Sequence, residues 1–521
     1  MMKKLAYIIL SITFLALNFG CADHLNTEST TSAKEDVIFS SASNAMASIN
    51  GAYRSMYSMG WGSAWEHENG GIMAYITASD LMGEDRLMNN QGSGWFYMDY
   101  AYNILGDYTS SAGRQYQCWN FFYTLISNVN YILAHENDEA LQDDPDLANY
   151  LFGQAYAMRA YCYLWLVQNY QQNDPSLPGV PIYTEPTTIA SKGKGRGTVQ
   201  DVYDRINEDI NTAISYFDNS SVEQQHPSHI DKYVAYGIKA RAMMVQHNYK
   251  EAVTAAKEAL KKPGASIVPF SNTSTVNNVN NSNVMWGLEI LADQSLGNGG
   301  IYAHMDADCG GTYCVAQHLI SSWLYNQIPA TDSRRAWWTD PAEVDENSAL
   351  PSYQKPYIQH KLVFINSRIM TGDYILMRME EMALIVAEAA CHDKDYTTAR
   401  EYVKMVTSQR DSDYEANLAK YPDSNNITTE TSTQINSLMD YILFQRRIEL
   451  WGEVSRMHDL QRLGLPMHRN FGSEESNNHI SDGIAYDYEA GYDGFIYAIP
   501  LEEFNGNTAM NPETDQNPMD Y

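Results

Sequence analysis

Flat aromatic rings and hydrogen-bonding side chains alternate along the segment between residues 80 and 103. Neutral sugars present apolar C–H faces to a ring and hydroxyl groups to amides, carboxylates and guanidinium groups. A site for them therefore needs rings as platforms, with polar groups at their edges. The candidate platforms are Trp95, Tyr97 and Tyr100, and the candidate hydrogen-bonding partners are Asp80, Arg86 and Asn103. Packing within a loop is the competing interpretation for each of them.

The composition of the 521-residue chain favours the same class of ligand. It holds 38 Tyr and 10 Trp against 14 Phe, so rings that also carry a hydrogen-bonding group dominate. The formal net charge is −30, which repels phosphate backbones and anionic lipid surfaces. We therefore expect no nucleic-acid partner, and a ligand that is neutral or cationic.

No motif in the sequence specifies an enzyme. His67-Glu68 lacks the second histidine of a zinc-binding HExxH motif, and no phosphate-binding glycine loop or GxSxG nucleophile is recognisable. A glycosidase needs two facing carboxylates, but with 64 acidic residues such a pair can be named anywhere. We therefore expect a binding protein without catalytic residues.

A short cluster of potential metal ligands follows residue 303. The cluster comprises His304, Asp306, Asp308 and Cys309. Its spacing departs from that of an EF-hand, because Gly310 and Gln317 occupy positions where calcium ligands are needed. We predict neither a metal site nor a cofactor, and leave open a structural cation such as calcium.

The first 20 residues are typical of a secretory signal. Lys3 and Lys4 supply positive charge, and residues 5–17 form an apolar stretch too short to span a bilayer. Gly20-Cys21 then resembles the end of a bacterial lipoprotein signal, with Cys21 lipidated. Residues 21–37 are predicted to be a lipid-anchored flexible tether, and 38–521 the folded domain. A secreted protein with a structural Cys21 is the alternative.

The other five cysteines do not form a disulfide framework, because their number is odd. Cys309 and Cys314 are close enough in sequence to bridge a loop in an oxidising envelope. Cys118, Cys162 and Cys391 lie in helical patterns and are predicted to be small buried residues.

Apolar residues recur at helical spacing over much of the chain, so the fold is predicted to be mainly α. The predicted helices are Ile38–Tyr57, Trp119–His135, Tyr150–Tyr170, Val202–Phe217, Tyr233–His247, Tyr249–Leu260, Ser321–Tyr325, Arg378–Ala390, Thr397–Ser408 and Leu438–Leu463, with a strand at Val284–Ile290. In the last helix, Glu453/Arg456 and Asp459/Arg462 have the spacing of ion pairs on a helix surface. Residues 58–118 and 263–373 lack such periodicity and are predicted to be loop-rich.

Two predicted helix pairs share one kind of turn. The turns His247-Asn248-Tyr249 and Lys394-Asp395-Tyr396 are each followed by alanine, at Ala252 and Ala399. These pairs resemble tetratricopeptide units, in which small residues let paired helices pack closely. The helical scaffold is expected mainly within residues 119–262 and 374–465. Since residues 263–373 separate its two parts, a simple solenoid is not expected.

Several motifs, taken together and in order, resemble the SusD/RagB family. The resemblance covers essentially the whole mature chain. The motifs are Ile49-Asn50-Gly51-Ala52-Tyr53; Gln154-Ala155-Tyr156-Ala157-Met158-Arg159-Ala160 with Val180-Pro181-Ile182; Ile375-Leu376-Met377-Arg378-Met379-Glu380-Glu381; Gln445-Arg446-Arg447-Ile448-Glu449-Leu450-Trp451-Gly452-Glu453 with Arg456, Asp459 and Arg462; and Ile499-Pro500, Glu503 and Gln516-Asn517-Pro518.

The resemblance implies a SusD-like fold and a lipoprotein of the outer membrane that faces the cell exterior. Such proteins bind oligosaccharides, sometimes peptides, and deliver them to a SusC-like TonB-dependent transporter. Their ligand face is built from loops of the N-terminal and middle regions, which adds Tyr302 and Tyr313 to the candidates. Trp119 and Trp286 match packing positions. The alternatives are a peptide- or amino-acid-binding member, a surface enzyme that degrades glycans, and an adaptor for proteins.

Overall fold

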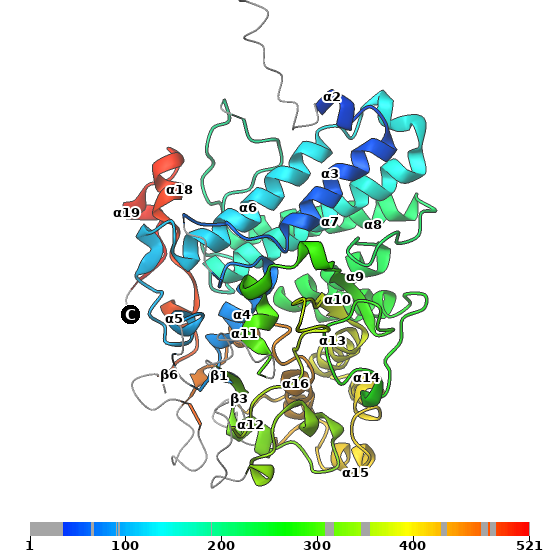
Figure 1. Cartoon of the computed structure of the whole chain (residues 1–521), viewed down its shortest axis with the longest axis vertical. Coiled ribbons are helices and arrows are strands. Elements are labelled where there is room, and N and C mark those ends of the chain that lie inside the picture. The colour runs from blue at the N-terminus through cyan, green and yellow to red at the C-terminus, as the bar shows by residue number, and fades with distance from the viewer. Residues whose placement is uncertain are drawn as a thin grey trace, which may run out of the picture.

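The computed structural model describes residues 35–63, 67–89, 91, 94–188, 190–307, 317–344, 355–428, 435–469, 478–479 and 486–519. It confirms the prediction that the fold is mainly α (Figure 1). The signal, Cys21, Cys309, Tyr313 and Cys314 lie outside the described residues. Among the described residues, no helix combines the length and the apolar character needed to cross a membrane.

The long helices form one array in chain order. Each of the first five long helices packs on the next: α6 (Arg114–Leu133), α7 (Pro145–Tyr170), α8 (Val199–Asp218), α9 (Lys232–Val245) and α10 (Tyr249–Ala259). The array continues from α10 to α13 (Met379–His392), and α13 contacts α14 (Tyr396–Thr407) and α16 (Leu438–Glu449). α3 (Ala42–Ser55) covers α6 and α7. The two predicted helical parts are therefore continuous in space, although residues 263–373 separate them in sequence.

The turns inside the two predicted helix pairs have the same geometry. His247 (φ 56°) and Lys394 (φ 64°) both adopt the left-handed backbone conformation. The next residue caps the following helix in each case: Asn248 accepts a hydrogen bond from Glu251 N, and Asp395 accepts one from Thr398 N. The alanines after each turn are buried, which allows close packing of the paired helices.

Short strands close the loop-rich middle region. β2 (Val284–Leu288) pairs antiparallel with β4 (Tyr374–Arg378), so both ends of this region meet beside the helical array. The other described sheets are also two-stranded and antiparallel: β1 (Arg86–Met88) with β3 (His318–Ile320), and β5 (Met467–His468) with β6 (Asp487–Tyr488).

The short helices are α2 (Glu35–Ile38), α4 (Ile72–Leu81), α5 (Tyr97–Tyr100), α11 (Ile301–Met305), α12 (Ser322–Asn326), α15 (Tyr414–Leu418), α17 (Arg456–Leu463), α18 (Leu501–Gly506) and α19 (Pro512–Asp515).

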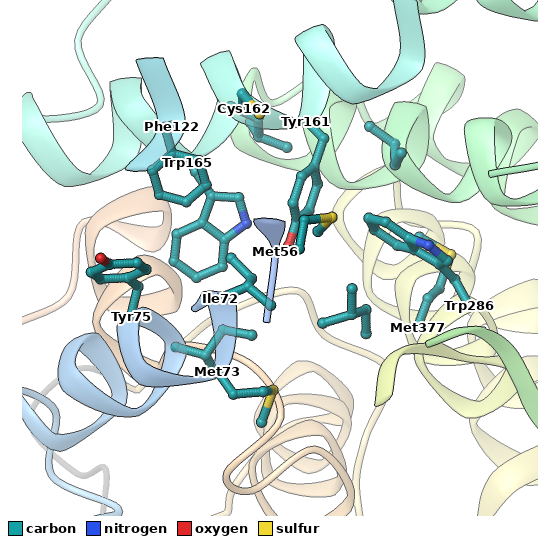
Figure 2. Close-up of a cluster of buried hydrophobic side chains, with 14 of the residues drawn as sticks. Met56, Ile72, Met73, Tyr75, Phe122, Tyr161, Cys162, Trp165, Trp286 and Met377 are labelled. Atoms are coloured by element: carbon teal, nitrogen blue, oxygen red, sulfur yellow. The ribbon is translucent and has the colours of Figure 1, made fainter. Parts of the chain in front are cut away.

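The core joins the helical array to the N-terminal segments and to β2 and β4. Figure 2 shows aromatic side chains of α6 and α7 facing residues of α4 and β2. Trp286 is fully buried, lies edge-on to Tyr161 at 5.1 Å, and donates a hydrogen bond to Ser228 O. The prediction that Trp286 is a core residue is confirmed. Cys118, Cys162 and Cys391 are free and buried, as predicted.

Two helix predictions need correction. All ten residues of α4 are buried, so it has no polar face and shows no amphipathic period within the predicted loop region 58–118. The predicted helix Leu438–Leu463 is two helices, α16 and α17. Gly452 between them has a φ of 75°, a left-handed conformation that a helix cannot contain.

The predicted surface ion pairs of this segment are buried and differently connected. Asp459 and Arg462 do pair, at 2.8 Å, but in the interior. Glu453 instead pairs with Arg378 at 2.6 Å, and Arg456 pairs with Glu84 at 2.8 Å. The helix break explains the difference, because it turns the charges toward neighbouring elements instead of leaving them on one exposed stripe.

Glu449, the last residue of α16, lies at the centre of a buried charge cluster. Its carboxylate is 3.2 Å from Arg334 Nη1, 3.0 Å from Arg378 Nη1 and 3.1 Å from Arg410 Nη2. Burial alone would raise the pKa of Glu449, but the three guanidinium groups hold it well below its ordinary value. The carboxylate is therefore charged and neutralises arginines from three separate segments.

Replacing Glu449 with glutamine should destabilise the protein strongly, because it leaves buried guanidinium groups without their shared counter-ion. We expect Glu449→Gln to lower the free energy of unfolding by about 3–5 kcal/mol in a urea titration. Glu415→Gln, which removes an equal charge from the exposed pair with Lys404, should leave the titration midpoint unchanged. Equal midpoints for the two variants would contradict a stabilising role for the cluster.

Candidate functional site

The candidate site is the 94–103 loop, the segment from Gly94 to Asn103 that contains α5. Phe96 (φ 61°) and Tyr102 (φ 57°) both have left-handed backbone conformations, which are rare for large side chains and cost energy. Glu68 Oε2 accepts a hydrogen bond from Phe96 N at 2.6 Å, and Tyr102 Oη donates one to Met82 O at 2.6 Å. The surrounding protein thus imposes a specific shape on this loop.

A buried ion pair fixes the middle of the loop to the first turn of α6. Arg114 donates from Nε and Nη2 to the two carboxylate oxygens of Asp99, both at 2.9 Å. Its Nη1 donates to Glu68 O at 2.6 Å. Burial alone would lower the pKa of Arg114. The negative charges of Asp99 and, to a smaller extent, Glu68 instead raise that pKa well above its ordinary value. Such a two-pronged, charge-assisted contact fixes orientation as well as position.

The loop presents three of the predicted ligand-binding residues together. Trp95 and Tyr97 are half-buried and Asn103 is exposed. One face of Trp95 stacks on His67, with the ring centroids 4.6 Å apart and the planes 11° apart. Burial lowers the pKa of His67, which favours its neutral form. Two ring-bearing residues and an exposed amide on one held loop provide the chemistry expected for a sugar ligand.

Asp80 and Arg86 require correction, because both are buried within the protein. Asp80 is 3% exposed and Arg86 is 0% exposed. The carboxylate of Asp80 accepts a hydrogen bond from Arg456 N at 3.1 Å and pairs with Arg86 at 3.4 Å. Burial, opposed in part by Arg86, raises the pKa of Asp80 to about 6. These groups hold α4 against β1 and α17. Because both side chains are buried, a ligand on the surface does not contact them.

Tyr100 and Tyr302 are also interior residues and need the same correction. The guanidinium of Arg469 lies 4.8 Å from the centre of the Tyr100 ring, and the Tyr100 hydroxyl bonds His479 Nδ1 at 2.9 Å. Tyr302 Oη donates to the carbonyls of Val276 and Asp373. Their rings are enclosed by protein, so neither offers a free face. Tyr313 lies outside the described residues.

A second group of aromatic residues beside the loop was not predicted. It consists of Tyr486, Tyr488 and Tyr492, all half-buried. Tyr488 and Tyr492 stack with centroids 3.9 Å apart, and Tyr488 lies 5.2 Å from Tyr102 of the loop. The spacing of three tyrosines within seven residues was the available signal. Position along the chain does not indicate a shared surface, because only folding brings the C-terminal segment to the loop.

Two residues of the short cluster of potential metal ligands, His304 and Asp306, lie among the described residues. Among the described residues, no group of three or more His, Cys, Asp and Glu side chains is placed to hold a metal ion. Asp306 accepts a hydrogen bond from Phe364 N at 3.1 Å. Burial lowers the pKa of His304 to about 3. Asp308 and Cys309 lie outside the described residues, and the structural cation stays an open expectation.

Removing the negative charge of Asp99 should release the 94–103 loop while leaving the helical array folded. Asp99→Asn keeps the shape but removes the charge-assisted contacts to Arg114. We expect faster hydrogen–deuterium exchange confined to residues 94–105, with exchange in α7 and α13 unchanged. Asp107→Asn removes the same charge from an exposed position after the loop and serves as the matched control. Uniformly faster exchange would instead indicate a global role for Asp99.

Comparison with known proteins agrees with this architecture. A family model described as "Starch-binding associating with outer membrane" matches residues 77–244, and the SusD family model matches residues 334–519. A SusD-like protein of Formosa agariphila is 26% identical over 507 residues, covering 88% of this chain and 92% of that protein. Among solved structures, a SusD-like carbohydrate binding protein from Bacteroides vulgatus has a TM-score of 0.73 at 23% identity, covering 91% of this chain and 98% of that one. A laminarin binding SusD-like protein has a TM-score of 0.65 at 18% identity, covering 92% and 99%. This chain therefore belongs to the SusD/RagB family.

Proposed function

We propose that this protein binds a neutral oligosaccharide at the cell surface, with the 94–103 loop as its main contact. The observation that carries the proposal is the clamp between Arg114 and Asp99, which holds Trp95, Tyr97 and Asn103 on one pre-shaped loop. A pre-shaped site binds with a smaller loss of conformational entropy. The family descriptions that mention starch, carbohydrate and laminarin support this class of ligand.

The charges near the loop support binding without cleavage. Asp99 is 1% exposed, and both of its carboxylate oxygens are bonded to Arg114. Glu68 bonds the backbone of Phe96. A glycosidase needs one carboxyl group to donate a proton and another to attack or activate water, both facing the substrate. Asp99 and Glu68 are instead engaged in contacts that hold the shape of the 94–103 loop.

We further propose that the protein delivers its ligand to a SusC-like TonB-dependent transporter in the outer membrane. In this proposal Cys21 carries the lipid anchor and residues 21–37 act as the tether. The family description that places relatives in association with the outer membrane supports the location. The net charge of −30 keeps the folded part away from anionic lipid, which suits attachment by lipid alone.

Loss of the Trp95 ring should weaken glycan binding. In affinity electrophoresis with laminarin, starch and galactomannan, we expect at least one polysaccharide to retard the soluble protein. Trp95→Ala should bind it roughly tenfold more weakly, equivalent to about 1.4 kcal/mol. Tyr414→Ala, which removes a half-buried ring from α15, is the control, because α15 lies well away from α5 in the lower right of Figure 1. Absence of retardation by every polysaccharide would refute the carbohydrate function.

The transporter partnership is tested separately, on native membranes. We expect the full-length lipoprotein, extracted in mild detergent, to co-purify with an outer-membrane barrel of the TonB-dependent class. Cys21→Ser should lose the membrane association and the barrel, while still binding glycan in the electrophoresis assay. Recovery of the wild-type lipoprotein without any such barrel would refute delivery and leave glycan binding unaffected.

A further inference from the structure

A wide groove lies along α6, away from the residues assigned to the 94–103 loop. Residues of α6 form its floor, residues 183, 187 and 191–193 form one wall, and α18 forms the other. Its volume is about 500 Å³. This lies within the range of about 300–1,000 Å³ found for ligand sites in proteins. The groove is therefore large enough to hold a small ligand.

Aromatic rings lie along this groove, with Trp119 buried at its base and Tyr123 and Tyr183 half-buried. Trp119 and Tyr123 lie one turn apart on α6, with their ring centroids 4.7 Å apart. Tyr183 of the wall follows, 5.9 Å from Tyr123. Hydroxyl and amide side chains accompany the rings, among them Thr124, Ser127, Asn128 and Ser191. Rings flanked by uncharged hydrogen-bonding groups match the apolar faces and the hydroxyls of sugars.

One acceptor in the wall lacks a donor. Glu502 Oε2 is buried and receives no hydrogen bond from any residue that the structure describes. The adjacent Glu503 is satisfied, because its carboxylate accepts from Trp119 Nε1 at 3.1 Å and from Asn507 at 2.7 Å. Glu502 also lines the groove, so its carboxylate can accept a hydrogen bond from a ligand hydroxyl.

Hydrogen bonds within the protein hold the walls of the groove in place. Asn130 of α6 donates to Tyr183 O at 3.0 Å and to Glu185 O at 3.2 Å. Asn507, just after α18, donates to Lys194 O at 2.8 Å. A Cβ atom on Gly193 would lie only 1.8 Å from the Asn507 side chain, so glycine is needed for this close approach. These contacts tie both walls to each other and to α6.

We propose that this groove is a second binding surface for neutral oligosaccharide, separate from the 94–103 loop. The proposal rests on the proposed function for its class of ligand. Two carboxylates in the α18 wall outnumber the one lysine of the groove lining, Lys192. Together with the net charge of −30, this disfavours an anionic saccharide. The same helix serves both surfaces, because Arg114 in the first turn of α6 holds the loop and Tyr116 begins the floor of the groove. A long glycan can thus be held at two places on one rigid element.

Filling the groove tests the proposal on the intact soluble protein. Ser127 lines the groove and makes no hydrogen bond through its side chain within the described structure, so Ser127→Trp adds bulk without breaking a contact. In affinity electrophoresis with laminarin, starch and galactomannan, we expect about tenfold weaker retardation than for wild type. Ser215→Trp, on the exposed face of α8, is the matched control. Glu502→Gln, which keeps the shape but removes the charged acceptor, should also bind more weakly. Thermal melting checks that each variant is folded.

The outcomes separate the groove from the loop. Weaker binding by Ser127→Trp and Glu502→Gln, with Ser215→Trp unchanged, supports the groove whether or not Trp95→Ala also loses affinity. Wild-type retardation that both folded groove variants retain in full overturns the groove and leaves the proposed function intact. Failure of wild type to be retarded by any of the three polysaccharides overturns the proposed function, and with it the ligand class assigned to the groove.

Discussion

The carboxylate of Glu449 is shared by guanidinium groups from three segments that are distant in sequence. Arg334 comes from the middle region, Arg378 from the end of β4, and Arg410 from the turn after α14. Lys361, also of the middle region, donates to Glu449 O at 2.7 Å. Charges buried in this way are tolerated only with close partners. Their pairing therefore fixes how the loop-rich middle region lies against the helical array.

A second set of ion pairs extends this constraint toward the candidate site. Arg456 of α17 pairs with Glu84, and Arg447 of α16 pairs with Asp85. Both acids follow α4, so the C-terminal helices determine where α4 ends and β1 begins. The pair between Arg114 and Asp99 then holds the 94–103 loop on α6. The candidate ligand surface thus depends on its own buried ion pair, while separate buried pairs hold α4 and the middle region in place.

This arrangement divides stability and binding between different residues. Asp80, Arg86, Tyr100 and Tyr302 have the chemistry of a sugar site but contribute it to the interior. Trp95, Tyr97 and Asn103 remain accessible in part because buried ion pairs support their loop. The helical array supplies a rigid base for the loop and for the groove along α6 (Figure 1). Rigid elements position binding groups more accurately than free loops do.

The sequence by itself determined the amphipathic helices, the equivalent turns at His247 and Lys394, and the core position of Trp286. Each depends on local spacing, caps or side-chain type. Tertiary structure alone decided the rest. All residues of α4 are buried, so its sequence shows no amphipathic periodicity. Because the helix breaks at Gly452, Glu453 and Arg456 pair with residues of different segments. Whether an aspartate or a tyrosine meets ligand or core follows from which distant segments fold over it. Asp80 is therefore an interior residue and Tyr486 a half-buried residue beside the loop, since composition specifies what a side chain can bind but only packing decides what reaches it.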